Sequence, residues 1–166
     1  GDPVVFEDIR VTDITNVMRV CFDVASKEYL KGDDGLIPPH FLQEELMSRL
    51  MVTSNSLDTI CKSLIDLGEI VVAKKKEMRK LPRSYMRSLG SFIRRWMDCD
   101  DECFAKLING GDRISFEAYC MDPYLAAERF RSCRSSILMS GTLEPLEEYA
   151  EGLGLDDAVM RSFKSP

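Results

Sequence analysis

The sequence predicts an α+β fold, mainly α, with a helical part followed by a β-hairpin and a small βαβ unit. Apolar residues recur at helical spacing over much of Val11 to Met97, and from Phe104 onward they alternate as in strands. A chain of 166 residues with 45% hydrophobic residues can bury a modest core without disulfide or metal support. We therefore expect a helical domain over residues 1–102 and a mixed domain over residues 103–166.

Two helices are predicted in the first fifty residues. The first has Thr12 or Asp13 as its cap and ends before Gly32. The second spans about residues 38–50, because its two opening prolines suit the first turn of a helix.

Two longer helices follow. The third starts at the capping cluster TSNS, residues 53–56, and Gly68 either ends it or is tolerated at a cost of about 1 kcal/mol while the helix continues into a run of lysines. Pro82 breaks any helix that precedes it. The fourth helix then carries an apolar stripe from Tyr85 to Trp96, and we expect Trp96 and its neighbour Phe92 to be core residues.

After the fourth predicted helix, the apolar residues alternate with polar ones, as they do in strands. Asn-Gly-Gly-Asp at residues 109–112 supplies the turn of a β-hairpin, with Phe104 and Ile108 alternating with Lys106 in its first strand. The second strand is expected to alternate in the same way from Ile114 onward.

A helix and a further strand are predicted after the hairpin. Asp122 caps the helix, with Pro123 at its first position, and residues 135–140 form the strand. Together with the hairpin they form a right-handed βαβ unit with parallel strands. Parallel strands need cover on both faces, so we expect this unit to lie at the edge of a larger sheet.

The charges are segregated along the chain. The net charge of -6 argues against nonspecific nucleic-acid binding by the whole molecule, but from Lys74 to Arg95 the only acid is Glu77, and acids gather directly afterwards at residues 98–102. The basic block can be a solvated helix face or a contact surface for phosphates, with Tyr85 as a stacking side chain. Our candidate nucleic-acid contacts are Lys74, Lys75, Lys76, Arg79, Tyr85, Arg87, Arg94 and Arg95.

The six cysteines are scattered among apolar residues, and we interpret them as reduced thiols. Cys99 and Cys103 have a spacing compatible with half of a zinc or iron–sulfur site. No second pair follows, and the only histidine, His40, is distant in the sequence. We expect no metal site, although a thiol redox or metal protein stays open as a third class of function.

A turn follows the last predicted strand. Ser140 and Thr142 flank Gly141, so their hydroxyls lie within reach of one another. Ligands of open α/β sheets bind beyond the carboxyl ends of the strands, so this turn is either functional or a plain connection to the next helix. Pro145 is expected at the first position of that helix, with Glu144 as an unusual cap.

The run YCMDPYLAAERFRSCRSSILMSGTLEPLEEYAEGLGL, residues 119–155, resembles the DNA helicases of the XPD family in superfamily 2. The third motif of that family reads Ser-Gly-Thr-Leu followed by Ser-Pro-Leu, and Glu144 stands here in place of the usual Ser. FKSP, residues 163–166, is similar to the start of the family's second motor domain. Residues 81–108 are similar in layout to its helical insertion, the arch domain.

The resemblance implies part of an ATP-dependent DNA helicase acting in nucleotide excision repair or a related pathway. The arch domain would shape the path of single-stranded DNA, and Ser140, Gly141 and Thr142 would couple ATP hydrolysis to unwinding without taking part in the chemistry. The full-length parent would bind ATP, magnesium and a 4Fe–4S cluster. Its partners would be single-stranded DNA, the remaining motor domains and regulatory protein subunits, in the cytoplasm of an archaeal-type cell or in a eukaryotic nucleus.

Two features limit this expectation. The sequence has no Gly-x4-Gly-Lys-Ser/Thr loop and no Asp-Glu-Ala-His box, so these residues alone are predicted to be inactive and to hold no cofactor. No apolar run approaches the roughly 20 residues that cross a bilayer, so no membrane partner is expected. The alternative is a module that docks regulatory proteins without contacting DNA, through residues 98–102 and 39–50.

Overall fold

The computed structural model describes residues 1–99 and 102–163 and divides into two compact units. The helical unit is Gly1–Ala118, and the C-terminal unit is Tyr119–Pro166. None of the helices within the described residues is both long and apolar enough to span a membrane.

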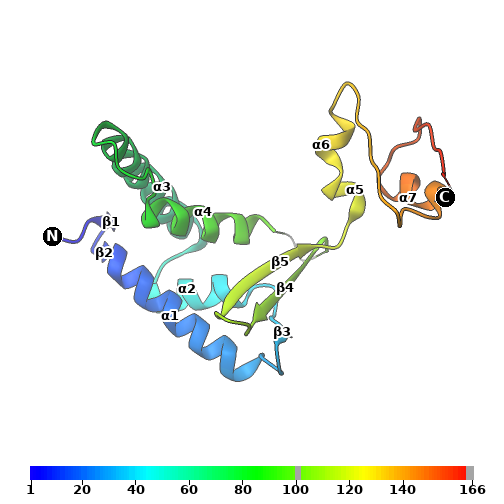
Figure 1. Cartoon of the computed structure of the whole chain (residues 1–166). Helices are drawn as coiled ribbons and strands as arrows, with labels where there is room; N and C mark the ends of the chain where they lie inside the picture. Colours follow the sequence, from blue (N-terminus) through cyan, green and yellow to red (C-terminus); the bar gives the residue numbers. More distant parts are fainter. Residues whose placement is uncertain (100–101, 164–166) are drawn as a thin grey trace. The chain divides into compact units, whose positions relative to one another are not determined.

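Four helices form the helical unit, as the sequence predicted (Figure 1). They are α1 (Val11–Glu28), α2 (Phe41–Leu50), α3 (Ser54–Glu77) and α4 (Tyr85–Asp98). A short ribbon of β1 (Val4–Phe6) and β2 (Ile9–Arg10) precedes them.

The helix ends show which capping predictions were right. Thr53 caps α3, since its hydroxyl accepts the backbone N–H of Ser56 at 3.2 Å. The prediction for α1 was wrong by two or three residues. Arg10 occupies the cap position, and Asp13 lies inside the first turn, where its carboxylate accepts the backbone N–H of Arg10 at 2.8 Å. The far end of α1 is Glu28, ahead of Gly32.

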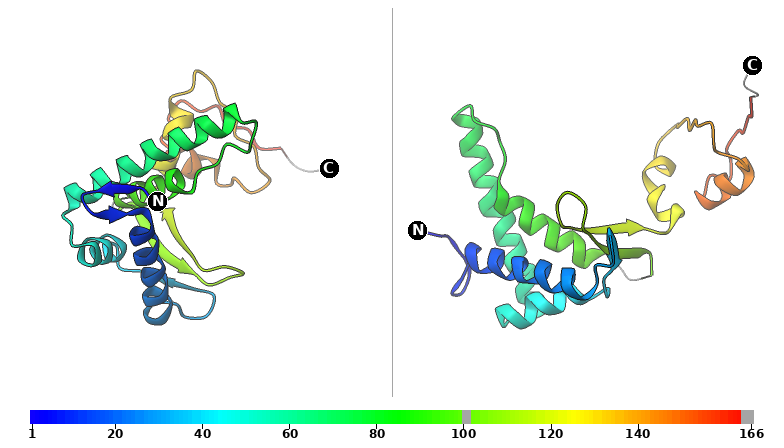
Figure 2. Two further views of the ribbon diagram at one scale, coloured as in Figure 1. Left: turned by 90° about the vertical axis from the view of Figure 1, so that its left-hand side faces the viewer. Right: turned by 60° about the horizontal axis from the view of Figure 1, so that its bottom comes forward.

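α3 continues through Gly68 to Glu77. Gly68 therefore lies inside the helix and does not end it. Its backbone lies against α4: a Cβ atom on Gly68 would be 2.5 Å from the backbone nitrogen of Arg87. Gly90 of α4 lies against α3 in the same way, where a Cβ would be 2.7 Å from the carbonyl oxygen of Cys61. Glycine at both positions therefore permits the close crossing of α3 and α4 (Figure 2).

The core of the helical unit is built from one face of each helix and from the sheet. Leu89, Ile93 and Trp96 of α4 are buried and Phe92 packs against them, as the apolar stripe predicted, but Tyr85 is exposed. The largest fully buried side chains are Ile14, Cys21, Leu42, Leu46, Leu57, Ile60, Cys61, Leu64, Ile93 and Ile108.

A sheet in the order β3–β4–β5 completes this unit. The predicted hairpin is confirmed as β4 (Phe104–Asn109) and β5 (Ser115–Cys120). The third strand, β3 (Asp34–Leu36), was not predicted and pairs antiparallel with β4. Its short Gly-containing sequence has the composition of a loop, and Gly35 is required there because a Cβ would lie 1.9 Å from the carbonyl oxygen of Tyr29.

Lys106 corrects the predicted alternation of β4. Residues two apart in a strand share a face, so Lys106 lies on the same side as Ile108, and its side chain is only 5% exposed. Its amine donates to the carbonyl oxygen of Pro39 at 3.0 Å and lies 5.6 Å from the centre of the Trp96 ring. The buried charge is therefore solvated by protein groups.

The hairpin belongs to the helical unit. Phe116 stacks on Phe22 of α1 with ring centres 4.2 Å apart, and its ring lies 5.7 Å from that of Trp96. The two units consequently divide after Ala118, whereas the sequence pattern placed the division at residue 102.

The C-terminal unit contains α5 (Pro123–Ala126), α6 (Glu128–Arg131) and α7 (Leu146–Gly152). Asp122 caps α5 as predicted, because its carboxylate accepts the backbone N–H of Tyr124 at 2.9 Å. Arg131 links α6 to two other segments of the unit: its guanidinium lies 3.5 Å from the centre of the Tyr124 ring of α5 and donates to the carbonyl oxygen of Leu153, just after α7, at 3.1 Å.

The predicted strand at residues 135–140 is not formed, so the βαβ unit is absent from the described residues. Ile137 and Met139 are 84% and 87% exposed. The side chains have strand propensity, but a strand exists only through a hydrogen-bonded neighbour, and no described segment pairs with this one.

Candidate nucleic-acid interface

One face of α4 is polar and open. Ser84 begins the helix, and its hydroxyl accepts the backbone N–H of Arg87 at 3.4 Å. Ser88 donates its hydroxyl to the carbonyl oxygen of Ser84 at 3.1 Å. Ser91 and Arg95 continue the face because residues three, four and seven apart lie on one side of a helix.

A groove of about 490 Å³ follows this face, and a second hollow of about 530 Å³ continues it toward the start of α4. The two share Arg87 and Ser88, so we treat them as one feature, the α4 groove. Its lining residues are Pro82, Arg83, Ser84, Tyr85, Arg87, Ser88, Ser91, Phe92, Arg95, Trp96, Cys99 and Ala118. None of these is acidic, so the part of the groove that the structure describes is lined by cations, hydroxyls and aromatic rings.

The structure separates the three predicted arginines of α4. Arg87 and Arg95 line the groove, whereas Arg94 does not. Arg94 turns to α3, where its Nε lies 3.4 Å from a carboxylate oxygen of Asp58. Arg87 also has a partner on α3, since its Nε lies 2.8 Å from Oε1 of Glu69.

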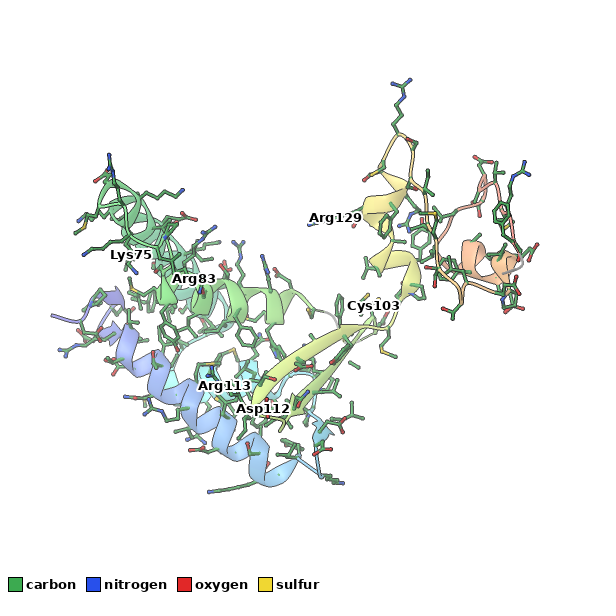
Figure 3. All side chains as sticks on the ribbon, viewed as in Figure 1. Lys75, Arg83, Cys103, Asp112, Arg113 and Arg129 are labelled. Atoms are coloured by element: carbon green, nitrogen blue, oxygen red, sulfur yellow. The ribbon has the colours of Figure 1, made fainter. Side chains whose placement is uncertain are left out.

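The predicted lysines lie at the end of α3, outside the groove lining. Lys74, Lys75 and Lys76 occupy the last turn, where cations complement the negative end of the helix dipole. The Lys75 amine donates to the carbonyl oxygen of Arg83 at 2.6 Å, and Figure 3 shows both residues where the chain passes from α3 to α4. Arg79, just beyond the helix, has a positive φ of 53°.

Several lining residues were not among the sequence candidates. Arg83 lies within the basic block, and Ser88 and Ser91 lie one and two turns from the cap, Ser84. A helical projection would have placed both serines on one face with Arg95. Phe92 was assigned to the core, yet it is only half-buried and also lines the groove.

None of the six cysteines forms a disulfide within the part of the chain that the structure describes. Burial raises the pKa of the Cys21 thiol to about 11 and that of Cys61 to about 12. Within the described residues, no three side chains of histidine, cysteine, aspartate or glutamate are grouped to hold a metal ion.

The two hydroxyls of the turn at residues 140–142 lie within reach of one another, as predicted, although the described residues directly before the turn form no strand. The hydroxyl oxygens of Ser140 and Thr142 are 3.1 Å apart, and the backbone N–H of Thr142 donates to the Ser140 hydroxyl at 3.2 Å. Both side chains are exposed and available to a further polar partner.

The expected cap after this turn was wrong. Pro145 itself occupies the cap position of α7, and the helix begins at Leu146. Glu144 instead accepts a hydrogen bond from the hydroxyl of Ser162 at 2.6 Å. A proline carbonyl can accept the first helical hydrogen bond without any side-chain cap, which frees Glu144 for this contact.

Two sequence features fall partly outside the described residues. Asp100 and Asp101 belong to the acidic segment at residues 98–102, and Lys164, Ser165 and Pro166 belong to the final FKSP.

The fold and the groove define a helical domain with a small β-sheet and one cationic helix face open to a ligand. The family model described as HBB, the helical and beta-bridge domain, matches residues 5–152, and the chain belongs to this family. The domain is known from XPD-type helicases, so the chain is a helicase-associated helical domain. The match includes both the α4 groove and the turn at residues 140–142.

Proposed function

We propose that this chain is part of an ATP-dependent DNA helicase of the XPD type that acts in DNA repair, and that the α4 groove contacts single-stranded DNA. The observation that carries the proposal is the pair Arg87 and Arg95 in a groove without a described acidic lining residue. Arginine binds phosphate through several N–H donors, which supplies affinity independent of base sequence.

A single strand suits the groove better than a duplex. Tyr85 is exposed at the far end of the groove, and the half-buried ring of Phe92 lies in its wall. Aromatic faces stack on bases only where those bases are unpaired and turned outward. A duplex would present phosphates to the arginines but no base faces to these rings.

The test compares two neighbouring arginines of one helix. We expect Arg95→Ala to weaken binding of a fluorescein-labelled oligothymidine about tenfold in an anisotropy titration, because a charge-assisted contact of about 1.5 kcal/mol is lost. The slope of log K against log salt should fall by about 0.7, as for one phosphate contact on a single strand. Arg94→Ala is the matched control, since Arg94 pairs with Asp58 away from the groove. Equal effects of the two changes would contradict a path along the groove.

For the turn at residues 140–142 we propose a coupling role in the full-length enzyme. Its two hydroxyls can exchange donor and acceptor roles as the nucleotide state changes. In that enzyme Thr142→Ala should lower unwinding more than ATP hydrolysis. An equal loss of both activities would argue against coupling. ATP, magnesium and the iron–sulfur cluster would bind to motor residues that this sequence does not contain, in a cytoplasmic or nuclear enzyme.

A second candidate function is the docking of a regulatory protein. It is favoured by the exposed apolar side chains of Met78, Leu81 and Tyr85, which lie among the cations between α3 and α4. A surface that combines apolar and cationic groups suits an acidic protein segment with apolar anchors. Absence of oligonucleotide binding at low salt, with both arginines intact, would favour this function over DNA contact.

A further inference from the structure

The two arginines of α4 that line the groove, Arg87 and Arg95, differ in their surroundings. Arg87 lines both parts of the groove, and its guanidinium is held by Glu69 at 2.8 Å. Arg95 is not paired with any carboxylate within the described residues. A phosphate that enters the groove along α4 therefore meets Arg95, which has no such partner, and Arg87, which already has a counter-ion.

The position of Glu69 follows from the close crossing of the helices. It comes directly after Gly68, whose backbone lies against the backbone of Arg87. The absence of a side chain on Gly68 brings α3 near enough for the next residue to reach the guanidinium. The packing of the helices thus fixes an acid beside Arg87.

We infer that Glu69 is a resident counter-ion that competes with phosphate for Arg87 and lowers the affinity of the α4 groove for single-stranded nucleic acid. This inference rests on the proposed function of the groove. The Arg87 and Glu69 side chains are 50% and 51% exposed, and ion pairs this exposed are weak. A strand that carries many phosphates can displace such a carboxylate, whereas a single small anion gains too little to do so.

The consequence is a groove that holds a strand without trapping it. When the strand binds, Arg87 exchanges Glu69 for a phosphate, and when the strand leaves, the carboxylate returns. The net gain from Arg87 is therefore smaller than that from Arg95. A low barrier to release suits a surface along which a strand must move.

The experiment replaces Glu69→Gln, which keeps the size of the side chain and removes its charge. We expect the Kd for labelled oligothymidine at low salt to fall three- to fivefold, with a steeper salt dependence as Arg87 becomes available. Asp58→Asn is the matched control: it removes one charge from the same helix, but its partner Arg94 does not line the groove. This control should change the Kd less than twofold.

A second pair of variants tests whether the effect acts through Arg87. In an Arg87→Ala background, the gain from Glu69→Gln should disappear, because the competition has been removed. A gain that persists there, or that Asp58→Asn reproduces, would overturn the inference and indicate only a general loss of negative charge.

The same titrations separate the two proposals. If the wild-type chain binds and Arg95→Ala weakens it while Glu69→Gln changes nothing, the counter-ion role is wrong and the proposed function stands. If neither the wild type nor Glu69→Gln binds at low salt, the proposed function fails and the inference fails with it.

Discussion

Replacing Gly68 with alanine places a methyl group against the backbone of α4. The added carbon would lie 2.5 Å from both the Cβ and the backbone nitrogen of Arg87, and ordinary contact begins at about 3.4 Å, so the helices must separate by about 0.9 Å. Overpacking costs about 1–3 kcal/mol, and the upper value applies because backbone atoms cannot rotate away. Alanine returns about 1 kcal/mol through its better helix propensity, which leaves a net loss of about 2 kcal/mol.

A thermal melt followed by circular dichroism measures this loss. For the helical unit, Gly1–Ala118, an unfolding entropy of about 2.1 cal/mol/K per residue converts it into a decrease in Tm of about 8 °C. Gly152→Ala is the control, since Gly152 is in α7 with nothing within 4 Å of the added carbon, and it should not lower the Tm. If Gly68→Ala melts at or above the wild-type temperature, the gain in helix propensity is larger than the cost of the clash with Arg87. The claim that α3 and α4 need glycine at this position is then refuted.

Three further outcomes are expected. Thr53→Ala removes the cap of α3 and should lower the free energy of unfolding by about 1 kcal/mol in denaturant titrations. Gly154→Ala should accelerate hydrogen exchange in α7, because Gly154 has a φ of +65° and an added Cβ would lie 2.4 Å from the Tyr124 ring. Burial raises the thiol pKa of Cys21 and Cys61 from 9.0 to about 11 and 12, so the folded state keeps these protons longer than the unfolded state. Stability should therefore be full below pH 9 and fall as the pH rises from about 9 to 12, less steeply when both are changed to alanine.

The sequence was sufficient for the elements whose cause is local. The spacing of apolar residues predicted all four long helices, and the caps Thr53 and Asp122 follow from the chemistry of side chains next to a helix start. The hairpin followed from Asn-Gly-Gly-Asp between two alternating runs.

Structural features that depend on contacts between residues far apart in the sequence were not predicted. The role of Gly68 was left open because its reason lies in the backbone of Arg87, nineteen positions later in the sequence, which leaves no room for a side chain at this point of α3. The strand at residues 135–140 was predicted from propensity, but pairing needs a neighbour that propensity does not reveal.

The same distinction between local and long-range causes applies to the candidate site. The basic block was visible in the sequence, but the rotation of α4 against α3 decides that Arg95 lines the groove and that Arg94 faces Asp58. In the sequence, Arg94 and Arg95 are two adjacent residues of equal charge. Their different surroundings are set only when α3 packs against α4.

Trp96 is both a core side chain and part of the groove wall, and it is the only tryptophan of the chain. Its indole has Phe92 on one side and the Lys106 amine 5.6 Å from the ring centre. We therefore expect the emission of one unlabelled fluorophore to report two events: a change in intensity when a ligand enters the groove beside the indole, and a red shift when the core opens to water. Ligand binding and unfolding of this domain can be followed in one cuvette, without a dye on either molecule.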